Sequence, residues 1–181
     1  MNKPPPRVAA TALTVLSLGA LDADARLPAA VAASEFDLRQ VGSGELLYFG
    51  FSIYDASLWT PEGRFDGFVE GRPVALSLWY KRGFSRDELV DITVRAWRKL
   101  GSVSPQQQQD WTAELSGIWN DVTAGDNMTT VVLPGRETLF YDQRGRVGRI
   151  DDPRFGPAFL NIWLGPQSVV GDLRAELLGL E

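Results

Sequence analysis

The sequence of 181 residues contains neither cysteine nor histidine. Without cysteine the protein has no disulfide, no thiolate nucleophile and no thiolate metal ligand, so its fold must be held by packing alone. Without histidine it lacks the commonest general base and the commonest metal ligand. Carboxylates, lysine, arginine, tyrosine and hydroxyl groups remain for any chemistry. The sequence therefore predicts no metal site and no cofactor.

Several motifs and charge patterns are also absent. There is no hydrolase nucleophile motif, no phosphate-binding loop and no glycine-rich dinucleotide fingerprint. The net charge is -5, and lysine and arginine form no dense block. This balance argues against nucleic acid, and against an anionic membrane surface, as the main partner. With 44% hydrophobic residues, the chain predicts one domain with a substantial core.

The start of the chain has the pattern of a signal peptide. A short basic region precedes an apolar stretch, residues 8–21, which is too short to span a bilayer. An Ala-x-Ala sequence follows, and it predicts cleavage between Ala25 and Arg26; the Ala-Val-Ala at residues 30–32 is a weaker alternative. We therefore expect residues 1–25 to be removed, and the mature protein to be periplasmic or secreted, with no insertion in the membrane.

The remainder divides into a short linker, residues 26–35, and one domain, residues 36–181. The domain is organised around the stretch from Gly42 to Trp59, in which both faces are largely apolar at period two. Such a run is typical of a strand that is covered on both sides. We interpret it as one long strand with a bulge or bend at Gly50. Residues 36–41 alternate, and we expect them to pair with this strand through a turn at residues 42–44.

One face of the organising stretch mixes hydroxyl groups with apolar side chains. Leu46, Tyr48, Ser52 and Tyr54 share this face. It could form the wall of a pocket for a mostly apolar ligand, or a second core layer whose tyrosine hydroxyls reach the surface. The alternation alone leaves both interpretations open.

The rest of the chain predicts further strands and four helices. Strands are expected at residues 73–81, 128–133, 137–141 and 147–150. A capping box at Ser85 starts a helix that ends at Gly101, and Ser104 and Pro105 start a second. A helix follows Asp152, which is better placed as a cap than as a metal ligand, and a last helix ends at Gly179. This order predicts an α+β domain with an antiparallel sheet and helices on one face.

Together these segments resemble the bacterial chalcone isomerase-like proteins. The resemblance lies in an ordered set of segments spread from about residue 36 to residue 178: Gly42–Gly44, Phe51–Trp59, Phe84–Ser85, Gly148–Asp152 and Phe159–Gly165. It implies the open-faced β-sandwich of chalcone isomerase, in which helices cover one side of a large antiparallel sheet. It also implies a ligand cleft between sheet and helices.

The resemblance does not extend to the catalytic residues of plant chalcone isomerase. The arginine that the enzyme and its fatty-acid-binding relatives share matches Leu46, which cannot hold an anionic oxygen. The catalytic tyrosine matches Phe84 or Ser85, its asparagine partner matches Asp91 or Ile92, and a serine or threonine matches Ile162. The sequence therefore favours a protein that is not an enzyme.

Three functions fit these observations. The first is an exported, non-catalytic protein that binds a small apolar or amphipathic ligand, such as a fatty acid, in a cleft lined by Leu46, Tyr48, Ser52, Tyr54 and Ile92. The second is an isomerase with a replaced catalytic set. The third is a structural or interaction domain whose cleft is filled by its own side chains. The sequence does not indicate the oligomeric state.

Overall fold

A computed structural model describes residues 27–180, so the predicted signal peptide and its cleavage position lie outside the described part of the chain. Six strands form one sheet in which every neighbouring pair is antiparallel and the spatial order follows the sequence. The strands are β1 Arg39–Tyr48, β2 Phe51–Thr60, β3 Val74–Tyr80, β4 Asn127–Val132, β5 Thr138–Asp142 and β6 Gly145–Ile150. The predicted antiparallel sheet is confirmed.

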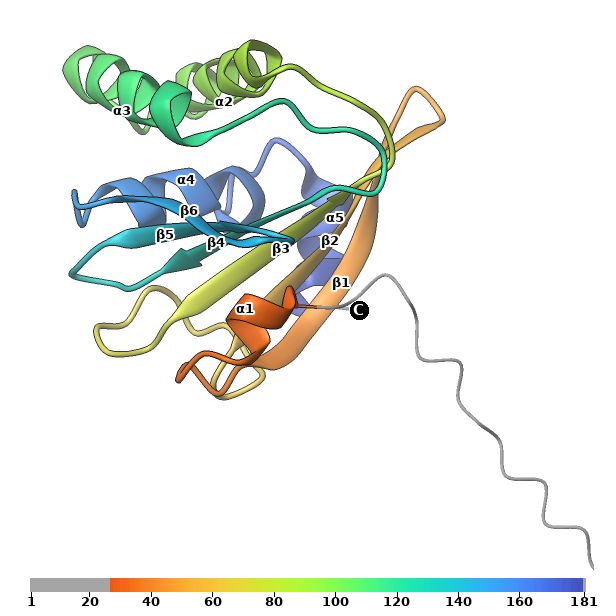
Figure 1. The fold of residues 1–181 in the computed structure, drawn as a ribbon, viewed down its shortest axis with the longest axis vertical. Helices are drawn as coiled ribbons and strands as arrows, with labels where there is room; N and C mark the ends of the chain where they lie inside the picture. Colours follow the sequence, from red (N-terminus) through yellow and green to blue (C-terminus); the bar gives the residue numbers. More distant parts are fainter. Residues whose placement is uncertain (1–26, 181) are drawn as a thin grey trace, which may run out of the picture.

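Helices cover one face of this sheet. They are α2 Arg86–Leu100, α3 Pro105–Ile118, α4 Phe155–Leu164 and α5 Gly171–Leu178. In Figure 1, α2 and α3 form a layer above the sheet and α4 lies between that layer and the strands. Their buried side chains and one face of the sheet form the main hydrophobic core. The expected architecture, an α+β fold with helices packed on one face, is confirmed.

Local sequence signals determine where α2 and α3 begin. The Ser85 hydroxyl accepts the backbone N–H of Glu88, and the Glu88 carboxylate accepts the backbone N–H of Ser85. Ser104 and Gln107 form the same reciprocal pair at α3. These bonds satisfy donors that the first turn of a helix leaves free. Both helix starts were therefore predictable from sequence.

The interpretation of residues 42–59 as one strand was wrong. The stretch is a hairpin: β1 and β2 pair along their length, and Phe49 and Gly50 form the turn between them. Both turn residues have positive φ, as a two-residue hairpin turn of type I′ requires. A Phe-Gly turn escapes detection because asparagine or aspartate is the usual residue before the glycine.

Gly42 and Gly44 do not form the expected turn; both lie within β1, at the contact with α5. A Cβ on Gly42 would overlap the carbonyl oxygen of Glu176 and lie 2.7 Å from that of Leu177. A Cβ on Gly44 would overlap the Glu176 carboxylate. These glycines are therefore present because α5 approaches the backbone of β1 closely, a contact between segments far apart in sequence.

The second face of the sheet has a smaller core. Helix α1, Ala29–Ala32, lies within the expected linker and packs on this face, opposite α2 and α3 in Figure 1. Its Val31 is buried together with Ala75, Val131, Leu139 and Tyr141. Part of the segment expected to be a linker is thus folded against the sheet.

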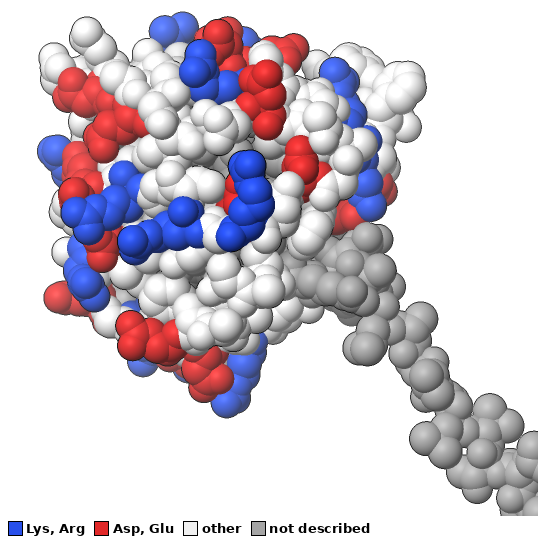
Figure 2. All heavy atoms as spheres, in the orientation of Figure 1, with Lys and Arg blue, Asp and Glu red and all other residues white. Residues whose placement is uncertain are grey.

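The surface carries charges of both signs. Figure 2 shows lysine and arginine interspersed with aspartate and glutamate over the face that it draws. No helix within residues 27–180 is long and apolar enough to span a membrane.

The expected cap of α4, Asp152, is not its N-cap: Arg154 holds that position, and no side chain within residues 27–180 caps this helix. The Asp152 carboxylate instead accepts the Arg154 backbone N–H at 2.9 Å, the Arg154 guanidinium at 2.8 Å and the Trp111 indole N–H at 3.2 Å. These donors, the Arg154 side chain first, lower the pKa of Asp152 to about 2. Asp152 therefore fixes the turn that precedes α4 and joins that turn to α3.

We predict that Gly42→Ala lowers the free energy of unfolding by about 2 kcal/mol, because the new methyl group meets backbone atoms that cannot rotate away. Gly117→Ala is the matched control. Gly117 lies in α3 with open space around its Cα, so alanine there should stabilise the protein by up to ~1 kcal/mol. Denaturant unfolding measures both values; equal stability of the two variants would contradict the close approach of α5.

We predict that Asp152→Asn lowers the free energy of unfolding by about 1 kcal/mol at neutral pH. The effect is this small because Arg154 is exposed, and solvent screens its interaction with Asp152. Because folding lowers the pKa of Asp152, its contribution is present at neutral pH and is lost as the pH falls toward 2. The difference between the two proteins should therefore shrink in acid. Asp151→Asn, which changes an exposed neighbour paired with Arg149, is the control. Equal effects of the two variants would contradict this role.

Candidate functional site

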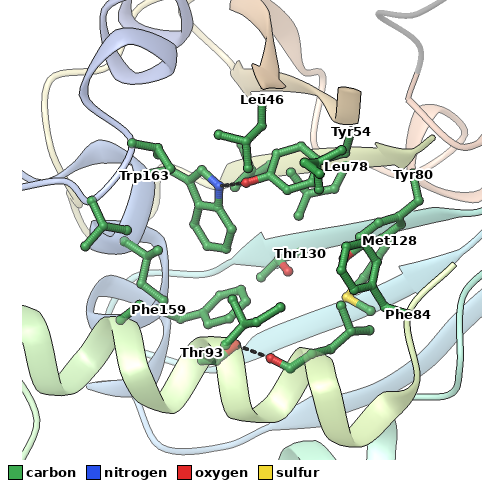
Figure 3. Close-up of a pocket in the computed structure, with 18 of the residues that line it drawn as sticks. Leu46, Tyr54, Leu78, Tyr80, Phe84, Thr93, Met128, Thr130, Phe159 and Trp163 are labelled. Carbon is green, nitrogen blue, oxygen red and sulfur yellow. Dashed lines mark hydrogen bonds between the residues drawn. The ribbon is translucent and has the colours of Figure 1, made fainter. Parts of the chain in front are cut away.

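A cavity of about 640 Å³ lies between α2 and the sheet. Leu76, Leu78, Met128 and Thr130 form its floor on β3 and β4. Leu89, Thr93 and Ala96 face it from α2, and Phe159, Ile162 and Trp163 close it from α4. Figure 3 shows side chains from these elements pointing into one common space. The lining is mostly apolar, as in sites that bind small apolar molecules.

A buried hydrogen bond joins α4 to β2 in the wall of the cavity. The indole N–H of Trp163 donates to the phenol oxygen of Tyr54 at 2.9 Å (Figure 3). Tyr80 lies beside Tyr54, with their ring centroids 5.9 Å apart. Burial raises the pKa of both phenols far above the ordinary value for tyrosine. Both hydroxyls therefore stay protonated at neutral pH and cannot act as bases there.

A β-bulge near the hairpin turn directs two consecutive residues into the helix side of the sheet. Leu46 pairs with Tyr54 and Leu47 pairs with Ser52, so Ile53 has no partner on β1. Consecutive residues of a regular strand point to opposite faces, but here Ile53 and Tyr54 both line the cavity. The bulge thus adds one apolar side chain to this wall.

Three cationic side chains line the cavity at its exposed margin: Arg82, Arg95 and Lys99. Arg82 stacks over the ring of Phe84 at 4.7 Å. Neither Arg95 nor Lys99 forms an ion pair with any residue in the range 27–180, and no acidic residue of that range lines the cavity. We call these three residues the basic rim. Free cations beside an apolar cavity can hold an anionic group.

The structure brings together four of the five residues proposed as the cleft wall. Leu46, Tyr48, Tyr54 and Ile92 line the cavity. Ser52 does not line it, because its hydroxyl donates to the Glu45 carboxylate across the hairpin. The single-strand interpretation had placed Ser52 on the face of Tyr54, and the bulge at Ile53 breaks that alternation.

The sequence interpretation missed the basic rim. Arg95 and Lys99 lie four positions apart on α2 and three and seven positions after Ile92, so helical spacing alone could have placed all three on one face. Arg82 lies in the connection before α2, where no periodicity applies. The sequence does not indicate the distance between α2 and the sheet. That distance determines whether the face of α2 with Arg95 and Lys99 borders a cavity.

Comparison with known proteins shows the family to which this chain belongs. The sequence profile of the chalcone isomerase-like family matches residues 22–179, nearly the whole chain. The chain belongs to the chalcone isomerase-like family. A Haemophilus influenzae protein is 25% identical over 140 residues, which cover 77% of this chain and 67% of that protein. The predicted family resemblance is confirmed.

A solved structure of similar fold comes from Arabidopsis thaliana. The chain resembles the crystal structure of a fatty-acid binding protein of that plant with a TM-score of 0.62 at 10% identity. The match covers 81% of this chain and 89% of the plant protein. At this identity, the likeness shows that the two chains share the chalcone isomerase-like fold.

The positions that match catalytic residues of chalcone isomerase carry no comparable chemistry here. Leu46, Phe84, Ile92 and Ile162 line the cavity with hydrocarbon side chains. Ser85, the alternative to Phe84, is occupied as the N-cap of α2. Asp91, the alternative to Ile92, is exposed and does not line the cavity. The cavity therefore offers shape and apolar surface where the enzyme offers polar groups.

We predict that this chalcone isomerase-like protein does not cyclise chalcones above the spontaneous rate. Cyclisation places negative charge on the ketone oxygen, and loss of one donor at such an oxygen typically costs ~10²–10³ in rate. The basic rim is exposed to solvent, where a cation stabilises that charge weakly. Loss of chalcone absorbance, followed with and without protein, measures the rate. Clear acceleration by the protein would show that another residue set is catalytic.

Proposed function

We propose that this protein binds a small amphipathic molecule, of fatty-acid type, in the cavity between α2 and the sheet, without transforming it. One observation carries the proposal: a large apolar cavity has a basic rim, and no acidic residue in the range 27–180 lines it. The hydrocarbon part of the ligand would occupy the space among Leu78, Met128 and Phe159. Its anionic group would lie at the margin, near Arg95 and Lys99.

The cavity has the size and polarity that such a ligand needs. Its volume of about 640 Å³ falls within the ~300–1,000 Å³ of typical small-molecule sites. Two of the polar groups within it are already engaged: the Thr93 hydroxyl donates to the Leu89 carbonyl, and the Tyr54 oxygen accepts from Trp163. An apolar chain would therefore leave these groups satisfied, and it would gain the free energy of removal from water.

The solved relative supports the same class of ligand. The Arabidopsis protein that shares this fold is described as a fatty-acid binding protein. At the position that matches the family's arginine, this chain has Leu46. We propose that the basic rim, on and near α2, takes over the role of holding the anionic group.

The two alternative functions have less support. An isomerase would need a free polar group at the reacting atom. Leu46, Phe84 and Ile92 offer hydrocarbon side chains, and the nearby hydroxyls of Tyr54 and Thr93 are already hydrogen-bonded. A structural domain with a filled cleft would leave no open volume of this size. A protein that binds a ligand without transforming it fits both the apolar walls and the open volume.

We further propose that the protein acts outside the cytoplasm. Support comes from the sequence alone, in the basic start, the apolar stretch of residues 8–21 and the Ala-x-Ala ending at Ala25. An exported carrier of an insoluble amphiphile would act in the periplasm or the medium.

We predict that the native chain binds a fluorescent fatty acid, and that Arg95→Gln combined with Lys99→Gln weakens this binding about tenfold, because exposed charge pairs contribute up to ~1 kcal/mol each. The methyl ester of the same fatty acid should bind both proteins equally, since it carries no charge. Fluorescence titration measures each dissociation constant.

Arg98→Gln is the matched control for this experiment. Arg98 lies on the same helix, bonds to Gln108 and does not line the cavity, so its replacement should leave the affinity unchanged. Equal losses for the acid and its ester would contradict a role for charge at the rim. Absence of binding by the native chain would contradict the proposed function itself.

A further inference from the structure

The turn between β1 and β2 carries four large apolar side chains in water. Phe49 is 85% exposed and Phe51 72% exposed, and Leu47 and Tyr48 are more than half exposed. We call these four residues the hairpin tip. In Figure 1 the tip projects from the body of the protein, and the same corner in Figure 2 carries uncharged atoms. Single exposed apolar residues are ordinary, but a cluster of four on one projection indicates an interaction site.

The backbone of Phe49 adopts a conformation that is unfavourable for a bulky side chain. Its φ is 50°, in the left-handed region that glycine, asparagine and aspartate tolerate and that bulky residues avoid. Packing contributes little that could offset this strain, because the side chain is mostly exposed and its ring meets that of Tyr48 at a centroid distance of 4.6 Å. Asparagine would suit both the turn and the solvent better. Folding alone therefore gives no reason for phenylalanine at this position.

The hairpin tip lies at the entrance of the cavity. Pairing between β2 and β3 ends at Tyr54 and Tyr80, so the hairpin continues past the end of β3. Tyr48 lines the cavity while remaining mostly exposed, and Ile92, 44% exposed, lines it from α2. An apolar surface thus runs from the tip into the cavity.

The same entrance is positively charged. Arg82, Arg95 and Lys99 border it, and Arg82 follows β3 within two residues of the last pair with β2. The charge of the whole chain is negative, so the composition argued against an anionic surface as the main partner. Only the fold shows that three cations gather at one entrance beside the apolar tip.

We propose that the hairpin tip docks on the surface of a lipid bilayer that contains anionic lipids. Phe49 and Phe51 enter the boundary between headgroups and acyl chains, Tyr48 lies at headgroup level, and the basic rim faces the lipid phosphates. Aromatic residues with adjacent cations are typical of membrane-interface contacts. In this orientation the cavity entrance opens toward the membrane.

The shape of the tip favours a bilayer over a protein partner. A stable protein interface buries roughly 800 Å² on each partner and needs a complementary, extended surface. Four side chains on one narrow turn offer less than this. A bilayer surface has no fixed shape to match, and a small apolar projection aided by cations is sufficient for reversible binding.

The absence of cysteine permits a local test. Phe49→Cys, made in the full chain, gives one site for a polarity-sensitive dye, and Val69→Cys gives a control site. Val69 is also exposed, and it lies in the connection after β2, at the opposite end of that strand. Each labelled protein is titrated with vesicles of phosphatidylcholine, alone or mixed with phosphatidylglycerol. Because the dye reports only its own surroundings, vesicle binding by residues 1–26 does not imitate the signal.

We predict that vesicles with phosphatidylglycerol raise the dye emission several-fold at position 49 and leave it unchanged at position 69. Phosphatidylcholine alone should give a smaller change, and added salt should weaken the response. Phe51→Thr in the protein labelled at position 49 should raise the lipid concentration at half-response about tenfold, since it removes one aromatic side chain from the apolar boundary.

Two results would overturn the proposal. The first is a dye at position 49 that stays in a watery environment with both kinds of vesicle. The second is a change of emission that depends on protein concentration without vesicles, which would assign the tip to contact between two copies of the chain.

The test is separate from ligand binding, because Phe49 and Phe51 do not line the cavity. The unlabelled variant Phe49→Asn should keep the affinity for a soluble fluorescent fatty acid. Failure of the proposed ligand and failure of the membrane contact are therefore distinguishable.

Discussion

A cluster of aromatic rings sets the distance between the helices and the sheet. Trp97 of α2 and Trp111 of α3 contact Phe155 of α4, which stacks on Phe159 at 5.4 Å, and Phe159 contacts Trp163. Rings of this size hold α2 away from the strands along its whole length, because a helix is rigid. Between its first turn and Trp97, α2 presents Leu89, Thr93 and Ala96, which line the cavity opposite the strands. The cavity is the space that results.

This origin explains the chemical character of the site. The walls belong to a packed core, and some of their few polar groups bond within the wall, as in the Tyr54–Trp163 pair and the bond from Thr93 to the Leu89 carbonyl. Within the described part of the chain, the charged side chains that line the cavity are Arg82, Arg95 and Lys99. They lie at its margin, where water solvates them and little burial penalty arises. A site with a dry interior and a charged entrance is suited to an amphipathic molecule. It is poorly suited to proton transfer, because the raised pKa values of Tyr54 and Tyr80 keep both phenols neutral.

The sequence predicted four residues that line the site and missed the charged ones for a definable reason. Leu46, Tyr48 and Tyr54 were found because alternation along a strand assigns side chains to faces, and Ile92 because helical spacing does the same. Ser52 was misplaced because the bulge at Ile53 shifts the alternation by one residue, and a bulge at an ordinary isoleucine has no sequence signal. Arg95 and Lys99 appear in sequence as solvated residues of a helix, since nothing local distinguishes a charge at a cavity entrance from one on an open surface.

The sequence by itself determined the elements whose signals are local: the capping box at Ser85, the helix start at Ser104 and Pro105, the helix stop at Gly101, the strand and helix order and hence the α+β class. Only the tertiary structure decided the hairpin at Phe49, the close approach of α5 that explains Gly42, the packing of α1 on the second face and the open volume beneath α2. Each of these depends on contacts between residues far apart along the chain. A one-dimensional pattern specifies which face of an element is buried, but it does not specify the partner of that face or the distance between them.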